Sequence, residues 1–146
     1  MFNKWDIRFI NLAKEISSWS KDPSRQIGAV IVNQNKHVVG MGYNGFPSGI
    51  ADKEKRLKNK ELKRAISLHA EESAILNAKC DLDNCKIYVY GLPCCSHCAS
   101  MIIQSGIKEV YYQLSEKGES EHWKQNTDLA KSLFKEAKVK VKELKS

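Results

Sequence analysis

Four residues in two short motifs have the types and the spacing of a metal-dependent catalytic site. His69 and Glu71 belong to a His-Ala-Glu motif, and Cys95 and Cys98 form a Cys-x-x-Cys motif that begins 26 residues after His69. An imidazole and two thiolates are ligands that zinc prefers, and three protein ligands leave its fourth tetrahedral position open to water. The pattern therefore predicts an open zinc site, which is typical of catalytic rather than structural zinc.

Glu71 is the member of the set that zinc does not need as a ligand. Zinc lowers the pKa of a bound water to about 7, so a carboxylate beside that water can take its proton at neutral pH. A single carboxylate can then return protons to a ring nitrogen and to a departing amine. The chemistry that this pattern predicts is the hydrolytic deamination of an amino-substituted heterocycle.

Other interpretations of the same residues have to be weighed. A Cys-x-x-Cys motif alone is equally typical of a redox pair or of half a structural zinc site. His97 could replace His69 as a ligand, but it lies between the two cysteines on an expected helix and would point elsewhere. Cys94 and Cys98 would form a Cys-x-x-x-Cys pair, which is a poorer match. We therefore take His69, Cys95 and Cys98 as the predicted ligands.

The composition is typical of a single water-soluble domain spanning residues 1–146. The chain is 42% hydrophobic and 28% charged, and no apolar run approaches the ~20 residues that span a bilayer, so we expect a cytoplasmic protein without a membrane partner. The net charge of +7 favours phosphate-bearing partners without choosing among them. Five cysteines are an odd number, and we expect Cys80, Cys85 and Cys94 to be small buried or half-buried thiols.

Alternating helices and strands must position the two motifs. Apolar spacing and turn signals predict helices over about 2–20, from a cap at Ser67, at 95–104 and at 128–134. They predict strands at 26–32, 37–43, 85–90 and 107–112, and a lysine-flanked edge strand at 139–142. A polar loop is expected between the strand at 107–112 and the helix at 128–134. Residues 51–67 fit either a short helix or a loop. This order predicts an α/β fold, a three-layer α-β-α sandwich with a five-stranded mixed sheet and helices on both faces.

The two motifs and three further segments resemble the zinc-dependent cytidine/deoxycytidylate deaminase superfamily. The superfamily signature is H-x-E followed by P-C-x-x-C. The further segments are residues 24–32, 42–47 and 104–110, so the resemblance covers nearly the whole chain. The Gly-Tyr-Asn-Gly-x-Pro segment at 42–47 is most similar to the deoxycytidylate (dCMP) deaminases, cellular or phage-encoded. The resemblance implies a cytidine deaminase-like fold and the conversion of dCMP to dUMP and ammonia, which feeds dTTP synthesis.

The resemblance also implies roles for individual residues. His69, Cys95 and Cys98 would hold zinc, Glu71 would carry protons, Ser24 and Arg25 would meet the 5′-phosphate, and Asn44 would hydrogen-bond the deoxyribose. The family is similar in having a regulatory nucleotide site between the subunits of a hexamer, activated by dCTP and inhibited by dTTP with Mg²⁺. The loop that contains Asn44, Gly45 and Phe46 is expected to serve that regulatory site.

The chain departs from the family pattern in three places. Cys94, and not proline, immediately precedes the first predicted ligand, because Pro93 lies one residue earlier. Ser73 stands where the family commonly has Asn, and residues 113–116 do not match the family's aromatic after the fourth strand.

Different functions remain open beside dCMP deamination. A deaminase of dCTP, of a free nucleoside or of a tRNA base would keep the same zinc motif. A non-catalytic zinc module that binds nucleic acid would not need Glu71, so this residue separates the two classes. Because the Gly-Tyr-Asn-Gly segment favours a small nucleotide, nucleic acid is not the expected partner.

Overall fold

Five strands form one mixed sheet in the computed structural model, which describes residues 3–145. The strands are β1 (Gly28–Val32), β2 (Val38–Tyr43), β3 (Lys86–Gly91), β4 (Glu109–Leu114) and β5 (Lys140–Glu143). They lie in the order β2-β1-β3-β4-β5; β1 is antiparallel to both of its neighbours, and β3, β4 and β5 run parallel. The predicted five-stranded mixed sheet is confirmed, and β5 lies at the edge as expected.

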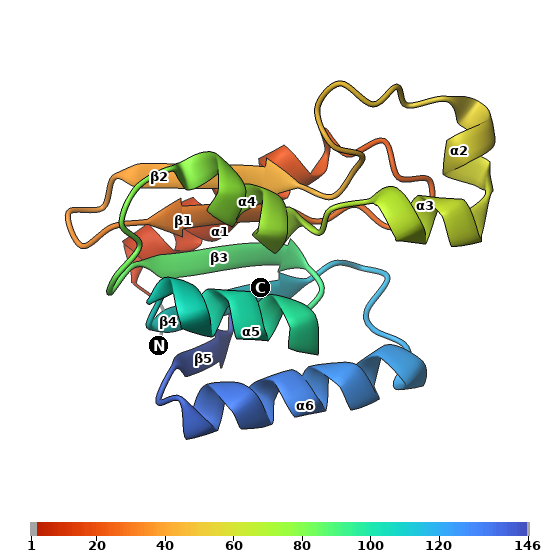
Figure 1. The fold of residues 1–146 in the computed structure, drawn as a ribbon. Coiled ribbons are helices and arrows are strands. Elements are labelled where there is room, and N and C mark those ends of the chain that lie inside the picture. Colours follow the sequence, from red (N-terminus) through yellow and green to blue (C-terminus); the bar gives the residue numbers. More distant parts are fainter. Residues whose placement is uncertain (1–2, 146) are drawn as a thin grey trace.

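Helices cover both faces of this sheet. They are α1 (Lys4–Ser17), α2 (Glu54–Lys58), α3 (Lys60–Ile66), α4 (Ala70–Ala78), α5 (Ser96–Ser105) and α6 (Glu121–Glu136). One face packs against α1 and the other against α4, α5 and α6, whereas α2 and α3 lie beyond the ends of the strands (Figure 1). The predicted α-β-α layering is therefore confirmed. No helix within residues 3–145 has both the length and the apolar character that crossing a membrane would require.

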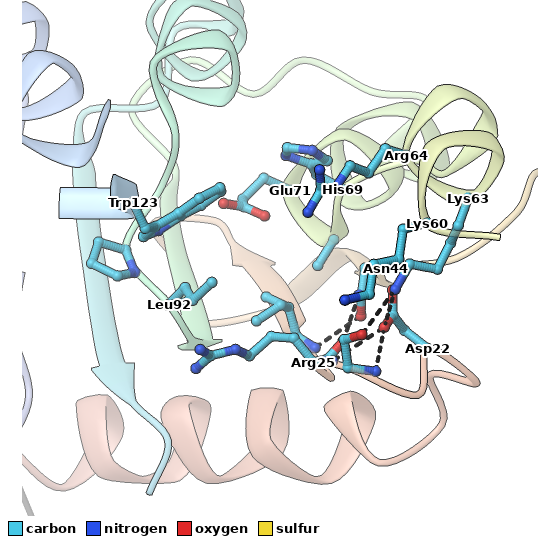
Figure 2. Close-up of a pocket in the computed structure, with 14 residues that line it drawn as sticks. Asp22, Arg25, Asn44, Lys60, Lys63, Arg64, His69, Glu71, Leu92 and Trp123 are labelled. Carbon is cyan, nitrogen blue, oxygen red and sulfur yellow. Dashed lines mark hydrogen bonds and ion pairs between the residues drawn. The ribbon is translucent and has the colours of Figure 1, made fainter. Parts of the chain in front are cut away.

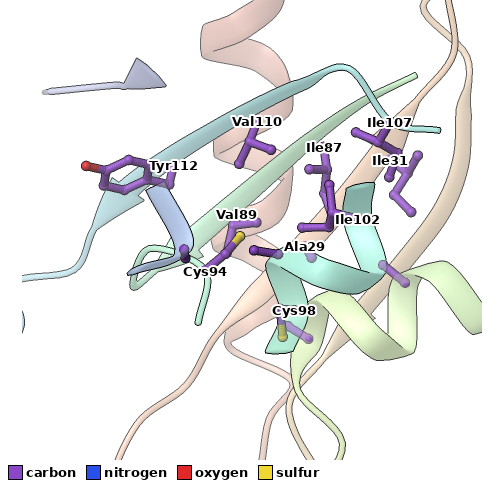
Figure 3. Packing of buried hydrophobic residues seen from close by; sticks show 14 of the residues in the cluster. Ala29, Ile31, Ile87, Val89, Cys94, Cys98, Ile102, Ile107, Val110 and Tyr112 are labelled. Atoms are coloured by element: carbon purple, nitrogen blue, oxygen red, sulfur yellow. The ribbon is translucent and has the colours of Figure 1, made fainter. Parts of the chain in front are cut away.

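The hydrophobic core has two parts, one on each side of the sheet. All five residues of β1 are buried, because this central strand sends alternate side chains into opposite layers. On the α1 side the core gathers Phe9, Ile10, Ile16, Val30, Val32, Tyr88 and Tyr111. On the other side it gathers Ile31, Ile87, Val89, Ile102, Val110 and Phe134, several of them visible in Figure 3. The helices that carry the two motifs, α4 and α5, belong to this second layer.

Helix α4 lies unusually close to β2 because two glycines of the strand present no side chain to it. A Cβ atom on Gly40 would lie 2.6 Å from the carbonyl oxygen of Ala74, and one on Gly42 would lie 2.6 Å from the amide nitrogen of the same residue. Real Cβ atoms do not approach backbone so closely, so any larger residue would push the helix away. These glycines thus fix the position of the helix whose N-terminus carries His69.

Strand boundaries agree with the predictions to within two residues, and the clearest errors concern helices. The predicted cap at Ser67 is wrong, since α4 begins at Ala70 with His69 as its N-cap. Ser67 is extended, and the next residue, Leu68, exchanges two backbone hydrogen bonds with Gly45. The Glu72 carboxylate accepts the amide proton of His69 at 2.8 Å and so caps the helix in place of a serine hydroxyl.

Two further segments differ from the sequence-based expectation. The expected polar loop before residue 128 is helical from Glu121 on, because α6 begins there and the Ser120 hydroxyl accepts the amide proton of Trp123 at 3.2 Å. Residues 51–67, for which the sequence allows either a helix or a loop, contain the two short helices α2 and α3. Helix α1 ends at Ser17, three residues before the expected end.

Candidate active site

The three predicted ligands converge where two helices begin. His69 is the N-cap of α4, Cys95 is the N-cap of α5, and Cys98 lies in the first turn of α5. The Nδ1 atom of His69 lies 3.2 Å from Sγ of Cys98 and 3.4 Å from Sγ of Cys95. All three ligand atoms lie within 4.8 Å of one another, and residues 3–145 contain no second group of this kind.

This arrangement has the donors and the spacing that zinc requires. Zn–N and Zn–S bonds of about 2.0 and 2.3 Å at tetrahedral angles would hold a nitrogen and a sulfur roughly 3.5 Å apart. The two measured nitrogen–sulfur distances of 3.2 and 3.4 Å are close to that separation. One imidazole and two thiols are also the donor set of an open zinc site, so the residues fit the metal.

The three predicted ligands shift one another's pKa values. A hydrogen bond with Cys98 lowers the pKa of Cys95 to about 4, although burial opposes the change. A hydrogen bond with Cys95 raises the pKa of His69 to about 9, again against burial. The bond with Cys95 and burial both raise the pKa of the Cys98 thiol. Because a metal ion replaces protons on its ligands, metal binding at this site is coupled to proton release.

Glu71 lies in the first turn of α4, directly beside this cluster. Its side chain is 4% exposed, and burial raises the pKa of its carboxyl above the ordinary value even though nearby His69 opposes the shift. The buried thiol of Cys94 donates a hydrogen bond to this carboxylate. Cys94, the departure from the family pattern, therefore faces Glu71, while Cys95 and Cys98 face His69.

The alternative ligand and the remaining cysteines lie outside the cluster. The His97 side chain is 73% exposed, and its Nε2 atom lies 3.7 Å from the carboxylate of Glu72. The structure thus brings His69, and not His97, to the two cysteines. Cys85 is buried as expected, but Cys80 is exposed, so the expectation of a buried or half-buried thiol is wrong there.

A cavity of about 410 Å³ opens beside His69 and Glu71. Its other walls come from the turn before β1, from α3, from the loop before α5 and from α6 (Figure 2). The lining residues besides His69 and Glu71 are Asp22, Ser24, Arg25, Ile27, Asn44, Lys60, Lys63, Arg64, Ala70, Leu92, Pro93 and Trp123. The structure therefore brings the predicted substrate residues Ser24, Arg25 and Asn44 into one pocket with His69 and Glu71.

Asn44 joins the two chain segments that border this pocket. Its amide oxygen accepts the backbone N–H of Ile27 at 2.8 Å, and its amide nitrogen donates to the carbonyl of Arg25, also at 2.8 Å. Because an amide nitrogen carries two hydrogens, one N–H remains for a further acceptor. Asn44 can therefore fix the pocket wall and still donate to a ligand.

Arg25 and Ser24 both have partners inside the protein. The Arg25 guanidinium donates to the carbonyl of Gly118 at 2.6 Å, and the Lys117 ammonium donates back to the carbonyl of Ser24 at 2.7 Å. These two bonds tie the loop after β4 to the turn before β1. The Ser24 hydroxyl accepts a hydrogen bond from Lys63 at 3.2 Å.

The sequence reasoning missed two parts of the pocket. Lys60, Lys63 and Arg64 of α3 belong to a Lys- and Glu-rich segment that is typical of a solvent-exposed surface. Their i, i+3, i+4 spacing nevertheless places them on one helix face. Trp123 falls within the expected polar loop, although residues 123, 127, 130 and 134 share helical spacing and pack inward. The indole N–H of Trp123 is buried and has no partner among the described residues.

The expected regulatory loop is divided between two cavities. Asn44 faces the pocket just described, whereas Gly45 and Phe46 line a second cavity of about 330 Å³ between the end of α1, β2 and α4. Large apolar side chains around that second cavity are exposed, namely Trp19, Met41, Tyr43 and Leu76.

The chain matches a known protein family and is similar in sequence to known deaminases. Residues 3–114 match the family described as the cytidine and deoxycytidylate deaminase zinc-binding region. An uncharacterised deaminase from the luxG 3′ region of Aliivibrio fischeri is 42% identical over 141 residues, which cover 97% of this chain and 94% of that protein. Mouse deoxycytidylate deaminase is 40% identical over 142 residues, which cover 93% of this chain and 77% of the mouse protein.

A solved structure has a similar fold. The crystal structure of dCMP deaminase from cyanophage S-TIM5 in complex with dCMP and dUMP aligns with a TM-score of 0.78 at 24% identity, and the alignment covers 99% of both chains. At that identity the likeness concerns the fold, and it extends over the whole sheet and its helices.

Proposed function

The chain belongs to the cytidine and deoxycytidylate deaminase family, and we propose that it hydrolyses dCMP to dUMP and ammonia. One observation carries the proposal: the ligand atoms of His69, Cys95 and Cys98 meet within 4.8 Å, and buried Glu71 lies beside them at the wall of a cation-lined pocket. The name of the mouse relative and the ligands in the phage crystal structure support dCMP as the substrate.

His69, Cys95 and Cys98 are the residues that would hold the metal. A zinc ion bound there supplies the Lewis acidity that makes a water molecule easy to deprotonate near neutral pH. Both cysteines lie at the N-terminus of α5, whose dipole favours the thiolate form that binds a metal. The His-Cys-Cys set and the zinc-binding description of the family both support zinc as the ion.

Glu71 carries the protons in this proposal. Its carboxylate accepts a proton from the attacking water and delivers it to the ring nitrogen next to the reacting carbon. It then takes the second proton from the hydroxyl group that has been added to that carbon and passes it to the amino group, which leaves as ammonia. One water is consumed, and the 4-amino group of the base is replaced by oxygen. A buried carboxyl whose pKa is raised holds a proton more readily than an exposed one, which suits a group that must both take and give.

The remaining pocket residues would hold the nucleotide. Leu92, Ile27 and Trp123 offer the base an apolar environment, and the free N–H of Asn44 offers a donor to the sugar. Ser24 and Arg25 border the same pocket and are proposed as contacts of the 5′-phosphate. An arginine suits that role because its guanidinium is always charged and can donate two parallel hydrogen bonds.

Regulation and assembly are proposed from the family resemblance. We expect a homohexamer, cytoplasmic and feeding thymidylate synthesis, activated by dCTP and inhibited by dTTP with Mg²⁺. The loop of Gly45 and Phe46 is the proposed contact to the regulatory nucleotide. The exposed apolar side chains of Trp19, Tyr43 and Leu76 around the second cavity support burial of this region against another subunit.

The direct test is ammonia release from a panel of substrates. Purified, zinc-replete protein is supplied with dCMP, dCTP, deoxycytidine or CMP, each with and without dCTP or dTTP plus Mg²⁺. We expect turnover to be highest with dCMP and to fall when dTTP is added. Preference for dCTP or deoxycytidine would contradict the substrate, and no turnover of any of the four would favour a tRNA base or a non-catalytic zinc module.

A further inference from the structure

We infer that α3 is the phosphate-binding wall of the pocket, with Lys60 and Arg64 as the residues that bind the 5′-phosphate of the nucleotide. This inference rests on the proposed function, because it concerns how the same pocket recognises its substrate. It adds these two cations to the family-based assignment, which gives the phosphate contacts to Ser24 and Arg25 alone.

The face that α3 turns to the pocket is entirely cationic. Lys60, Lys63 and Arg64 are spaced three and four residues apart, so they lie on one side of the helix, and all three line the cavity (Figure 2). Glu61, Leu62 and Ala65 of the same helix are exposed and do not line it. The helix therefore directs its positive charge into the same cavity that contains His69 and Glu71.

Lys63 anchors this helix and is not itself free to bind a ligand. Its side chain is nearly buried, and its ammonium lies 2.9 Å from the Asp22 carboxylate and 3.2 Å from the Ser24 hydroxyl. Its charge is therefore already balanced. The contact holds α3 against the turn before β1, which carries Arg25.

Lys60 and Arg64 have no such partner. Both are exposed, and neither side chain forms a hydrogen bond or ion pair with any residue between 3 and 145. Arg25, by contrast, already donates to the carbonyl of Gly118. Two uncompensated cations on one pocket wall match the charge of a phosphate monoester, which carries about −1.5 to −2 at neutral pH.

The wall is also fixed with respect to the reacting centre. Leu68, two residues after α3 ends, exchanges backbone hydrogen bonds of 3.1 and 2.8 Å with Gly45, and the next residue is His69. Gly45 in turn follows Asn44, whose side chain holds the backbone of Arg25 and Ile27. A phosphate bound at Lys60 and Arg64 would therefore be held by a helix that is tied to the active site at Lys63 and just beyond its C-terminal end.

The test compares a nucleotide with its phosphate-free nucleoside. In the double variant K60Q/R64Q we expect kcat/KM for dCMP to fall about 100-fold, since each charge-assisted hydrogen bond to the phosphate contributes roughly tenfold. We expect kcat/KM for deoxycytidine to change less than about twofold, because that substrate has no phosphate for these side chains to bind. The matched control K55Q/K58Q removes the same charge from exposed positions of α2 that do not line the pocket.

A binding measurement separates this inference from the proposed reaction. Calorimetry with dUMP and deoxyuridine measures the contribution of the phosphate without turnover. The protein could fail to deaminate dCMP and still bind dUMP more tightly than deoxyuridine. If only K60Q/R64Q then removes that difference in affinity, phosphate binding by α3 is supported and the proposed function is contradicted. If K60Q/R64Q behaves like K55Q/K58Q in both assays, or if wild-type protein binds dUMP no better than deoxyuridine, the inference is overturned.

Discussion

The predicted metal ligands and the phosphate-binding wall formed by α3 border one pocket but are built in opposite ways. His69, Cys95 and Cys98 sit at the starts of helices that pack directly on the sheet, and Cys98 has no exposed surface. The wall is a short helix beyond the ends of the strands, and apart from Lys63 its cations are exposed. The position of the ligand cluster depends on the hydrophobic core, whereas the position of the wall depends on a few polar contacts.

The two constructions suit different tasks, since one region holds metal ligands and the other recognises a charged group of the substrate. Ligand geometry must be held to a fraction of an ångström, which buried helix ends against a sheet can provide. Recognition of a charged group tolerates more movement and gains from accessible cations, which an outlying helix provides. Changes in the cluster should therefore affect every substrate equally, whereas changes in the wall should affect only those with a phosphate.

The largest effect is expected from removal of a ligand. Cys98→Ala should lower kcat for dCMP and deoxycytidine alike by at least about a thousandfold, because the metal contributes several kcal/mol to the transition state. Zinc content, measured by mass spectrometry of the purified protein, should fall well below one ion per chain.

The matched control for that variant is Cys80→Ala, which changes an exposed thiol outside the cluster. It should keep both zinc and turnover. Retention of full zinc content and activity in Cys98→Ala would remove this residue from the ligand set.

A smaller effect is expected where the wall is anchored. Asp22→Asn removes the carboxylate that pairs with nearly buried Lys63, and it should lower the free energy of unfolding by about 1–3 kcal/mol. Because α3 is then less firmly held, KM for dCMP should rise while kcat for deoxycytidine stays the same. Urea unfolding and steady-state kinetics measure the two effects.

Asp52→Asn is the corresponding surface control. Asp52 pairs with Lys21 at 3.3 Å in a solvent-exposed position, so its loss should cost less than about 1 kcal/mol. Equal destabilisation by the two substitutions would show that the Asp22–Lys63 pair does not anchor the wall.

The smallest effect concerns acid pH. Although burial opposes it, the hydrogen bonds from Lys63 and from the Ser24 and Arg25 amides hold the pKa of Asp22 below its ordinary value. The stabilisation by the ionised Asp22 is therefore complete above the unfolded pKa of about 3.9 and is lost as pH falls through the lower folded pKa.

Urea unfolding of wild-type protein and Asp22→Asn between pH 3 and 7 tests this expectation. The difference in unfolding free energy should be constant above about pH 5 and should shrink below about pH 4. Both proteins share the metal cluster, so loss of metal in acid cancels from the comparison. A difference that persists undiminished to pH 3 would contradict the assignment.

The proximity of His69, Cys95 and Cys98 could be predicted from the sequence because its determinants are local. His69 and Glu71 are two residues apart, and Cys95 and Cys98 are three apart. A strand precedes and a helix follows the cysteine motif, and a helix follows the histidine motif. The sheet was equally predictable, since the β-branched runs at 28–32 and 86–91 mark its central strands.

The wall could not be predicted because its structure depends on distant contacts. The sequence around Lys63 does not indicate that its partner is Asp22, which lies 41 residues earlier. The Lys- and Glu-rich segment also has too few apolar residues to define a helix face. The start of α4 was misplaced for a similar reason, since Leu68 is held extended by Gly45. The early turns of α6 were missed because buried Thr127 is polar and hides the helical spacing.

Glu71 is expected to move protons at a metal site that three other residues hold, and a comparison of zinc content with turnover tests that role. Zinc content and ammonia release from dCMP are measured side by side for wild-type protein, Glu71→Gln and the exposed control Glu136→Gln. We expect all three proteins to hold one zinc ion per chain, and Glu71→Gln alone to lose turnover by about a thousandfold or more. Turnover by Glu71→Gln at the wild-type rate, or loss of its zinc together with its activity, would contradict the account.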